Sequence, residues 1–521
     1  MPVKDVSADG ESQLLIPEII EKLGFGWAQV RAGVIGGGVY FADGAELLLI
    51  SAVTSAVAEQ WAMSPVEKSL VVMVVFVGIL LGNFVSGPVA DTYGRRQLIL
   101  ASFLGIVIFS ILSSLAVNFI TLSLWRFFVG AAFGLGQPAW NTLGAEITPA
   151  DWRVAMQGIS QGCFVLGELF SCMLLLLDDP HMERLHWRRL LQLGAIPAGI
   201  FLILALLFLH QSPSFLAVAG RREEATAVLE SMCHDNHVEV SCDYRVATRP
   251  NQLPPRMRRN SRRVSVQSSA DLRRQLFIVF GPDLRTSTFI VMYSCFVLNF
   301  LYYGCLYAFP QVLAESSTGS GGAALELLIG AIWEIPGQAL GIVCGLLLRR
   351  KLNMQLYLFL VGISTLAFVL GNTRNTHASH IVETIGYYGI KCFVDIGFVV
   401  VYQYSIEIYP TKVRATGSAI TVGSGRIGGI LSPLVYELIA SEGSYAVFFY
   451  VLVVLCAVNF LMIPLLKYET QGVPLKDELE EEAPEAPSQG GPQAAQQQST
   501  EEASPLLERE AALVPEPFVP R

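Results

Sequence analysis

Two carboxylic acids lie three residues apart inside a long apolar stretch of this chain. Asp43 and Glu46 come after the run Gly36-Gly37-Gly38 and would share one face of a helix. A carboxylate at such a depth is costly unless it is paired, protonated or wetted by a cavity. The two acids could therefore exchange a proton or hold a cation, and a static structural ion pair is the alternative interpretation.

Further ionisable side chains, three acids and three bases, lie inside other apolar stretches. They are Arg126, Glu168, Glu334, Lys391, Asp395 and Arg426. With Asp43 and Glu46 they form a net acidic set if all face one cavity, which favours an organic cation or a zwitterion as ligand. Lys391 and Asp395 are four residues apart and can pair along one helix face, so a structural role is favoured for them.

Aromatic side chains accompany these charges. Tyr302 and Tyr303, together with Trp140, Trp333, Tyr402 and Tyr404, could hold a cationic or planar ligand against their rings. Ordinary helix packing is the simpler interpretation for any single one of them.

The stretches that carry these residues are long enough to cross a membrane. Hydrophobic residues make up 52% of the 521 residues and charged residues only 15%, well below the usual quarter of a soluble domain. A soluble protein is disfavoured, because no amphipathic surface is left to cover so many apolar runs. Most runs meet the ~20-residue length that a membrane span needs, and we expect twelve spans, near 30–54, 67–89, 98–116, 119–145, 154–177, 188–210, 286–312, 323–348, 353–371, 379–406, 413–439 and 444–466.

One octapeptide occurs twice. Glu-Ile-Thr-Pro-Ala-Asp-Trp-Arg at 146–153 recurs as Glu-Ile-Tyr-Pro-Thr-Lys-Val-Arg at 407–414, each time after the fourth apolar run of a group of six. This repeat predicts an all-α membrane protein with two pseudo-symmetric six-helix bundles around a central site, an architecture typical of solute transport. The expected parts are an amino-terminal segment over 1–29, bundles over 30–210 and 286–466, a basic loop over 211–285 and a disordered acidic tail over 467–521.

Basic residues concentrate in alternate links between the spans. Examples are Arg95 and Arg96 after the second span, Arg153 after the fourth, and Arg349-Arg350-Lys351 after the eighth. The positive-inside rule places these links, and with an even number of spans both termini, in the cytosol. Residues 1–29 are polar and acidic, so no cleavable signal peptide is expected.

The link after the second span reads Gly87-Pro88-Val89-Ala90-Asp91-Thr92-Tyr93-Gly94-Arg95-Arg96. Such a turn can dock its arginines against acids and helix C-termini, and it could hold one gate closed until a rocking motion breaks the contacts. With the two octapeptides it resembles the signature loop of the major facilitator superfamily. The candidate gating residues are Gly87, Asp91, Gly94, Arg95, Arg96, Glu146, Arg153, Glu407, Arg414 and Arg426.

The second copy of this turn is reduced. It keeps Gly345 and Arg349-Arg350-Lys351 but lacks the aspartate. We therefore expect the cytosolic gate to depend mainly on the first copy.

Several short segments narrow the resemblance. Gly24-Phe25-Gly26-Trp27, Ala42-Asp43-Gly44-Ala45-Glu46, Tyr302-Tyr303-Gly304 and Gly425-Arg426-Ile427-Gly428 are similar to the SVOP-like group, close to the organic-ion transporters, over about residues 20–466. The long glycosylated loop of synaptic vesicle glycoproteins is missing, so their toxin-receptor and adhesion roles are not carried over. In this superfamily the first and fourth spans face one cavity, which makes Arg126 the natural counter-charge of Asp43 and Glu46. The resemblance thus favours proton coupling through Asp43, with Glu46 or Arg126 contacting substrate.

The expected cytosolic segments contain short regulatory motifs. Arg258-Arg259-Asn260-Ser261-Arg262-Arg263-Val264-Ser265 holds two Arg-Arg-x-Ser steps that a basophilic kinase could phosphorylate at Ser261 and Ser265, and a simple basic loop is the alternative. Glu502-Ala-Ser-Pro-Leu506-Leu507, and similarly Glu11 to Leu15-Ile16, match the pattern that clathrin adaptors bind. They favour an endolysosomal or secretory vesicle membrane over the plasma membrane.

Enzymes and metal sites are disfavoured by the remaining residues. The nine cysteines have no Cys-x-x-Cys spacing, the seven histidines form no ligand pattern, and no Gly-x-x-x-x-Gly-Lys loop is present for ATP. We expect no cofactor and no nucleic-acid partner. The leading hypothesis is a secondary active transporter of a small organic ion, proton-coupled by alternating access, and the alternative is a transporter-like vesicle scaffold or sensor.

Overall fold

A computed structural model describes residues 16–238, 269–316, 322–372, 377–410 and 413–471. Within this part of the chain, eleven helical segments are long and apolar enough to cross a membrane. The twelfth span is α17 (Arg414–Ala440), which is of similar length but richer in Gly, Ser and Thr. The expectation of an all-α membrane fold with twelve helices is confirmed.

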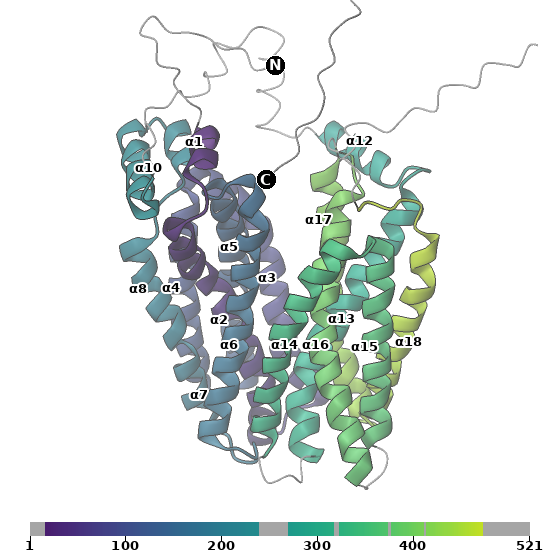
Figure 1. Cartoon of the computed structure of the whole chain (residues 1–521). Helices are drawn as coiled ribbons and strands as arrows, with labels where there is room; N and C mark the ends of the chain where they lie inside the picture. The colour runs from purple at the N-terminus through teal and green to yellow at the C-terminus, as the bar shows by residue number, and fades with distance from the viewer. Residues whose placement is uncertain (1–15, 239–268, 317–321, 373–376, 411–412, 472–521) are drawn as a thin grey trace, which may run out of the picture. The chain divides into compact units, whose positions relative to one another are not determined.

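Each half of the chain supplies six spans (Figure 1). The first half contains α2 (Trp27–Trp61), α3 (Pro65–Tyr93), α4 (Arg95–Ser114), α5 (Phe119–Glu146), α6 (Arg153–Asp178), and a sixth span made of α7 (Trp187–Gly194) and α8 (Ile196–Phe208). The second half contains α13 (Arg285–Ser316), α14 (Gly322–Leu347), α15 (Arg350–Asn372), α16 (His377–Glu407), α17 and α18 (Ala446–Met462). We call these the N bundle and the C bundle.

The sequence marks several helix ends by residue types with a clear physical role. Ser64 caps α3, its hydroxyl accepting the Glu67 N–H while the Glu67 carboxylate accepts the Ser64 N–H at 2.8 Å. Gly94 separates α3 from α4 with φ = +96°, a conformation that strains any residue with a Cβ. A Cβ there would also lie 2.0 Å from Gln211 Nε2. The glycine of the signature turn is therefore required by both backbone and packing.

Helix pairing repeats between the bundles. The first span packs on the fifth and the second on the fourth, as α2 on α6 and α3 on α5 in the N bundle, and α13 on α17 and α14 on α16 in the C bundle. Small residues allow close approach: a Cβ at Gly130 of α5 would lie 2.1 Å from the Val75 carbonyl oxygen of α3. Contacts between the bundles come from α3 with α17, α6 with α14 and α2 with α13.

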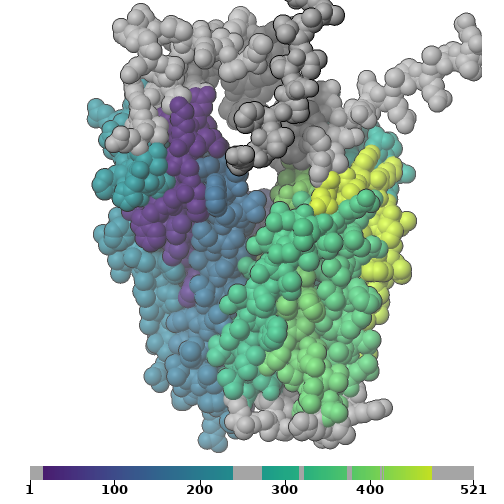
Figure 2. Space-filling view, viewed as in Figure 1, coloured from purple at the N-terminus to yellow at the C-terminus, as the bar shows by residue number. Residues whose placement is uncertain are grey.

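Short helices cover the end of the N bundle where Arg95 and Arg96 lie. They are α1 (Ile16–Leu23), α9 (Pro213–Val218) and α10 (Arg222–Asn236), and α1 lies against the helices that follow α8 (Figure 2). Arg31 of α2 forms an ion pair with Asp235 at 2.5 Å, and Phe25 stacks on Trp152 at 4.9 Å. In the C bundle, α12 (Ser269–Val279) contacts α17. We call the end of the helices that carries Arg95 and Arg350 the basic end, and the other the opposite end.

Candidate functional site

Arg126 and Glu46 form a buried ion pair inside the N bundle. Arg126 Nη1 of α5 donates to Glu46 Oε2 of α2 at 2.6 Å, and the side chains are 1% and 2% exposed. Arg126 is thus the counter-charge of Glu46, as expected, but it forms no ion pair with Asp43 among the described residues. Because both members of the pair are enclosed, their first role is to join α2 to α5.

Asp43 lies one turn earlier on α2 and makes no ion pair within the described ranges. Its Oδ2 accepts a hydrogen bond from Gln137 Nε2 of α5 at 2.7 Å, its Oδ1 has no partner there, and the side chain is 3% exposed. Sequence reasoning missed Gln137, although its place next to Pro138, inside an apolar run, is a weak signal. The structure separates the two acids into one paired and one unpaired carboxyl.

A second group of charges joins the two bundles. Lys391 Nζ of α16 contacts Glu168 Oε2 of α6 at 3.0 Å and also Glu334 Oε1 of α14. Tyr302 of α13 donates its hydroxyl to Glu168 Oε1 at 2.7 Å, and its ring centre lies 5.9 Å from Lys391 Nζ. Glu168 belongs to the N bundle and the other three residues to the C bundle. Asp395 lies one turn beyond Lys391 on α16, within electrostatic reach of Glu334 and Glu168. We call these residues, with Asp395, the central cluster.

The pairing of Lys391 with Asp395 that the spacing suggested is wrong. Lys391 turns instead to acids on two other helices, and Asp395 Oδ2 has no hydrogen-bond partner among the residues that the structure describes. The cause is the close crossing of α14 and α16, where a Cβ at Gly337 would lie 2.1 Å from the Cys392 carbonyl oxygen. This crossing brings Glu334 against Lys391. Lys391 therefore pairs with an acid of the neighbouring helix, although Asp395 shares its own helix face.

Arg426 of α17 lies near Asp43 and away from the charged turns of the basic end. Its Nη1 donates to the Tyr303 hydroxyl at 3.2 Å, and its charge acts on Asp43 without forming an ion pair with it. Tyr303 in turn packs edge-on against Phe76 of the N bundle, with ring centres 4.7 Å apart. Of the two groups in which the sequence analysis placed Arg426, these contacts put it with the buried span charges and not with the gate.

At the basic end of the N bundle, Arg95 and Arg96 fasten the signature turn. Arg95 Nη2 lies 3.0 Å from Asp91 and 3.2 Å from Glu146, and its guanidinium stands over the Phe215 ring at 5.1 Å. Arg96 donates to the carbonyl oxygens of Leu209 and Leu206 at the end of α8, at 2.5 and 2.9 Å. Asp91 is 74% exposed, so the Glu146 contact is the better protected of the two.

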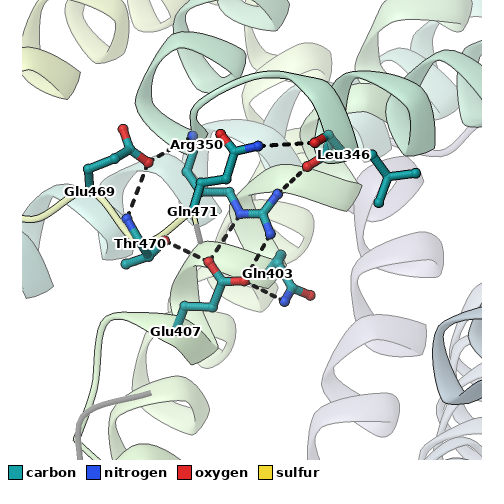
Figure 3. Close-up of polar contacts among 8 residues, drawn as sticks. Leu346, Arg350, Gln403, Glu407, Glu469, Thr470 and Gln471 are labelled. Carbon is teal, nitrogen blue, oxygen red and sulfur yellow. Dashed lines mark hydrogen bonds and ion pairs between the residues drawn. The ribbon is translucent and has the colours of Figure 1, made fainter. Parts of the chain in front are cut away.

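The C bundle builds a matching group without an aspartate (Figure 3). Arg350 donates to both carboxylate oxygens of Glu407, at 3.1 and 3.0 Å. Thr470 Oγ1 and Gln403 Nε2 also donate to Glu407, each at 2.6 Å, and Glu469 accepts the Arg350 N–H at 2.9 Å. Residues 469–471, which sequence reasoning missed, thus complete the second turn.

The other candidate gating residues are placed more loosely. A Cβ added at Gly87 would meet no atom within 4 Å, and Arg414 Nε donates to the Tyr409 carbonyl oxygen at 3.2 Å. Arg153 lines a cavity of about 190 Å³ together with Asn141, Gln157 and other residues of α5 and α6. Asn141 is four residues beyond Gln137, so this cavity lies one helical turn from the partner of Asp43.

At the opposite end, polar contacts cross between the bundles. Lys68 of α3 forms an ion pair with Glu437 of α17 at 3.0 Å and also contacts Gln311 of α13. The Tyr307 hydroxyl donates to Glu437 at 2.7 Å. By contrast, the Arg95 and Arg350 groups each lie within one bundle. Among the described residues, the polar contacts between bundles are thus at the central cluster and the opposite end.

The helix pairing and the buried charges define the class of protein: a twelve-helix membrane carrier of the major facilitator superfamily. Residues 32–481 match the model of the "Sugar (and other) transporter" family, and the chain belongs to that family. It is a carrier for small organic solutes and not an enzyme.

Individual relatives and solved structures agree with this assignment. The chain is 27% identical to organic cation/carnitine transporter 7 of Arabidopsis thaliana, over 91% of this chain and 98% of that protein. It is 24% identical to the synaptic vesicle 2-related protein of Xenopus laevis, over 85% and 79%. The inward open conformation of the xylose transporter XylE from E. coli shares the fold, with a TM-score of 0.65 and 17% identity over 86% of this chain and 97% of that one.

Proposed function

We propose that this carrier moves a small organic cation or zwitterion by alternating access, coupled to protons. The observation that carries the proposal is the central cluster, where Lys391 Nζ is held between Glu168 of the N bundle and Glu334 of the C bundle. Charges buried in membrane spans are expensive and mark ion or substrate pathways. A neutral sugar would have no need of three acids at this interface. The printed name of the Arabidopsis relative, an organic cation/carnitine transporter, supports the same class.

Asp43 is the proposed proton carrier. An enclosed carboxylate without a cation partner is costly, and the neutral acid is much less so. Among the described residues Asp43 has an amide partner and no ion pair, whereas Glu46 is held by Arg126. The cavity one turn away, lined by Asn141 and Arg153, offers access from the basic end.

The two ends supply the gates in this proposal. The basic end faces the cytosol by the positive-inside rule, and each of its charged groups, around Arg95 and Arg350, stays within one bundle. Lys68 and Glu437 join the bundles at the opposite end. This arrangement corresponds to a state that is closed at the opposite end and open at the cytosolic end. Rocking of the bundles would close the cytosolic end and open the opposite one.

Uptake by the purified full-length protein in proteoliposomes tests the proposal. Butylamine, carnitine and xylose would be compared with and without an inward proton gradient. Gradient-driven accumulation of butylamine or carnitine is expected. Accumulation of xylose alone would point to a sugar carrier, and no uptake of any probe would favour the scaffold or sensor hypothesis.

A vesicle location remains a hypothesis, because Ser261, Ser265, Glu502, Leu506 and Leu507 lie outside the described residues. The names of the synaptic vesicle 2-related relatives support it. Clathrin adaptors at the leucine pair and a basophilic kinase at the serines are the proposed partners. Replacing Leu506 and Leu507, together with Leu15 and Ile16, by alanine should move the tagged protein to the plasma membrane. An unchanged vesicular pattern would dispose of the sorting hypothesis.

A further inference from the structure

The central cluster holds more acid than base. Glu168, Glu334 and Asp395 supply three carboxyl groups, and in the part of the chain that the structure describes Lys391 is the one ammonium bound among them; all four side chains are at least nine-tenths buried. The other two span arginines of this region are engaged elsewhere, Arg126 with Glu46 and Arg426 with Tyr303. The cluster therefore has three carboxyl groups for one positive charge.

Two carboxylate oxygens of the cluster mark where a further positive charge could bind. Both oxygens of Glu168 are used, one by Tyr302 and one by Lys391. In contrast, Glu334 Oε2 and Asp395 Oδ2 are enclosed and have no hydrogen-bond partner in the part of the chain that the structure describes. Buried acceptors without donors are costly, and a charged N–H donor would satisfy both most strongly. Both lie on the C bundle, where Lys391 already occupies Glu334 Oε1.

We propose that Lys391 is a tethered cation that occupies part of the substrate's own binding position. The substrate is then a protonated amine or a guanidinium compound, whose N–H groups bind Glu334 and Asp395 while Lys391 remains with Glu168. A quaternary ammonium such as carnitine fits less well, because it has no N–H to donate, so butylamine is the better of the two expected substrates. This inference rests on the proposed function and specifies its substrate class. Displacing Lys391 from Glu334 leaves its contact with Glu168, which ties the two bundles, in place.

A charge-balanced double variant, Lys391→Met/Glu168→Gln, tests the competition. It removes one positive and one negative charge, so the net charge of the cluster is kept while Glu334 loses the lysine that occupies it. Binding of butylamine, butylguanidine and tetramethylammonium to full-length protein in nanodiscs would be measured by calorimetry. We expect butylamine and butylguanidine to bind about tenfold more tightly than to the parent, a typical size for a coupling of this kind, with little change for tetramethylammonium.

The matched control is Lys68→Met/Glu437→Gln. It removes a second lysine–glutamate pair that joins the bundles and that has no member in the central cluster. Its amine affinity should stay within about threefold of the parent, because it loosens the bundles without freeing a site. An equal gain in the control would show that release of the bundles, and not release of the site, raises affinity, and would overturn the inference.

Other outcomes are equally decisive. Unchanged or weaker amine binding by Lys391→Met/Glu168→Gln would show that Lys391 supports the site and does not compete for it. An equal gain for tetramethylammonium would refute the N–H requirement. If the parent binds no probe but the double variant binds amines, the proposed function fails and the inference stands; if neither binds, both fail. Should the double variant not elute as a folded protein, Glu334→Gln in the parent must weaken amine binding at least about tenfold.

Discussion

Replacing Arg126 by methionine should destabilise the protein far more than it alters substrate choice. The change leaves the Glu46 carboxylate enclosed at 2% exposure without its partner at 2.6 Å. Breaking a buried pair in this way typically costs about 3–5 kcal/mol. With an unfolding entropy of roughly 2.1 cal/mol/K per residue, this corresponds to a loss of roughly 3–5 °C if the whole chain unfolds as one unit, and about twice that if the N bundle unfolds alone.

The double variant Arg126→Met/Glu46→Gln separates a structural role from a substrate role. It removes both charges together, so most of the lost stability should return, and the coupling between the two sites should be about 1–3 kcal/mol. The measurement is the apparent melting temperature in nanodiscs, followed by fluorescence, with butylamine binding determined in parallel. The reasoning is refuted if the double variant melts no higher than Arg126→Met, or if Glu46→Gln loses amine binding at full stability.

Three further predictions follow from the unpaired acid and the two gates. Asp43→Asn should abolish accumulation under a proton gradient and preserve substrate exchange, because the amide keeps the shape but cannot titrate; undiminished accumulation in the uptake assay would make Asp43 structural. Lys68→Met/Glu437→Gln should open the opposite end more often, which would show as faster thiol labelling of a cysteine introduced there, and an unaltered rate would refute this gate. Glu146→Gln should slow turnover several-fold more than Asp91→Asn, because the exposed Asp91 pair contributes only about 0–1 kcal/mol, and the reverse order would contradict the assignment of Glu146.

The sequence predicts the fold well because its main constraint is local. A run of about 20 apolar residues must be a helix in lipid, where each backbone group needs an internal partner. The repeated octapeptide then identifies two halves, and the structure places the copies at equivalent helix ends, after α5 and after α16. The same reasoning finds which charges are buried, because an acid such as Glu168 stands out in an apolar run.

The partners of those charges could not be predicted, because they depend on how helices cross. Lys391 has Asp395 one turn away on its own helix, yet it binds Glu168 and Glu334. It does so because α16 packs closely on α14, with Gly337 at the crossing, and because Lys391 reaches Glu168 of α6 across the bundle interface. Glu469 lies after the last apolar run, where no periodic pattern remains to give it a role. Pairings of this kind are properties of the packed bundles and not of any single segment.

The charged turns of the two bundles make equivalent contacts, although the second turn has lost part of the sequence motif of the first. In the N bundle, the segment after the sixth span returns to the turn: Gln211 accepts the Arg96 N–H at 3.1 Å, and Leu209 offers its carbonyl oxygen to the Arg96 side chain. In the C bundle, Glu469 accepts the N–H groups of Arg350 and Lys351, at 2.9 and 3.4 Å.

Lys351 completes the correspondence, because its Nζ donates to the Leu466 carbonyl oxygen just as Arg96 donates to Leu209. In both halves, then, a polar side chain after the sixth span caps the first turn of the third, where free N–H groups favour an acceptor or a negative charge. The second turn lacks the aspartate, and Glu469 places a carboxylate beside the arginine from a different part of the chain. The expectation that the gate depends mainly on the first copy stays a prediction: the Arg95 side chain forms ion pairs with Asp91 and Glu146, whereas the Arg350 side chain forms one with Glu407 and its backbone N–H is accepted by Glu469.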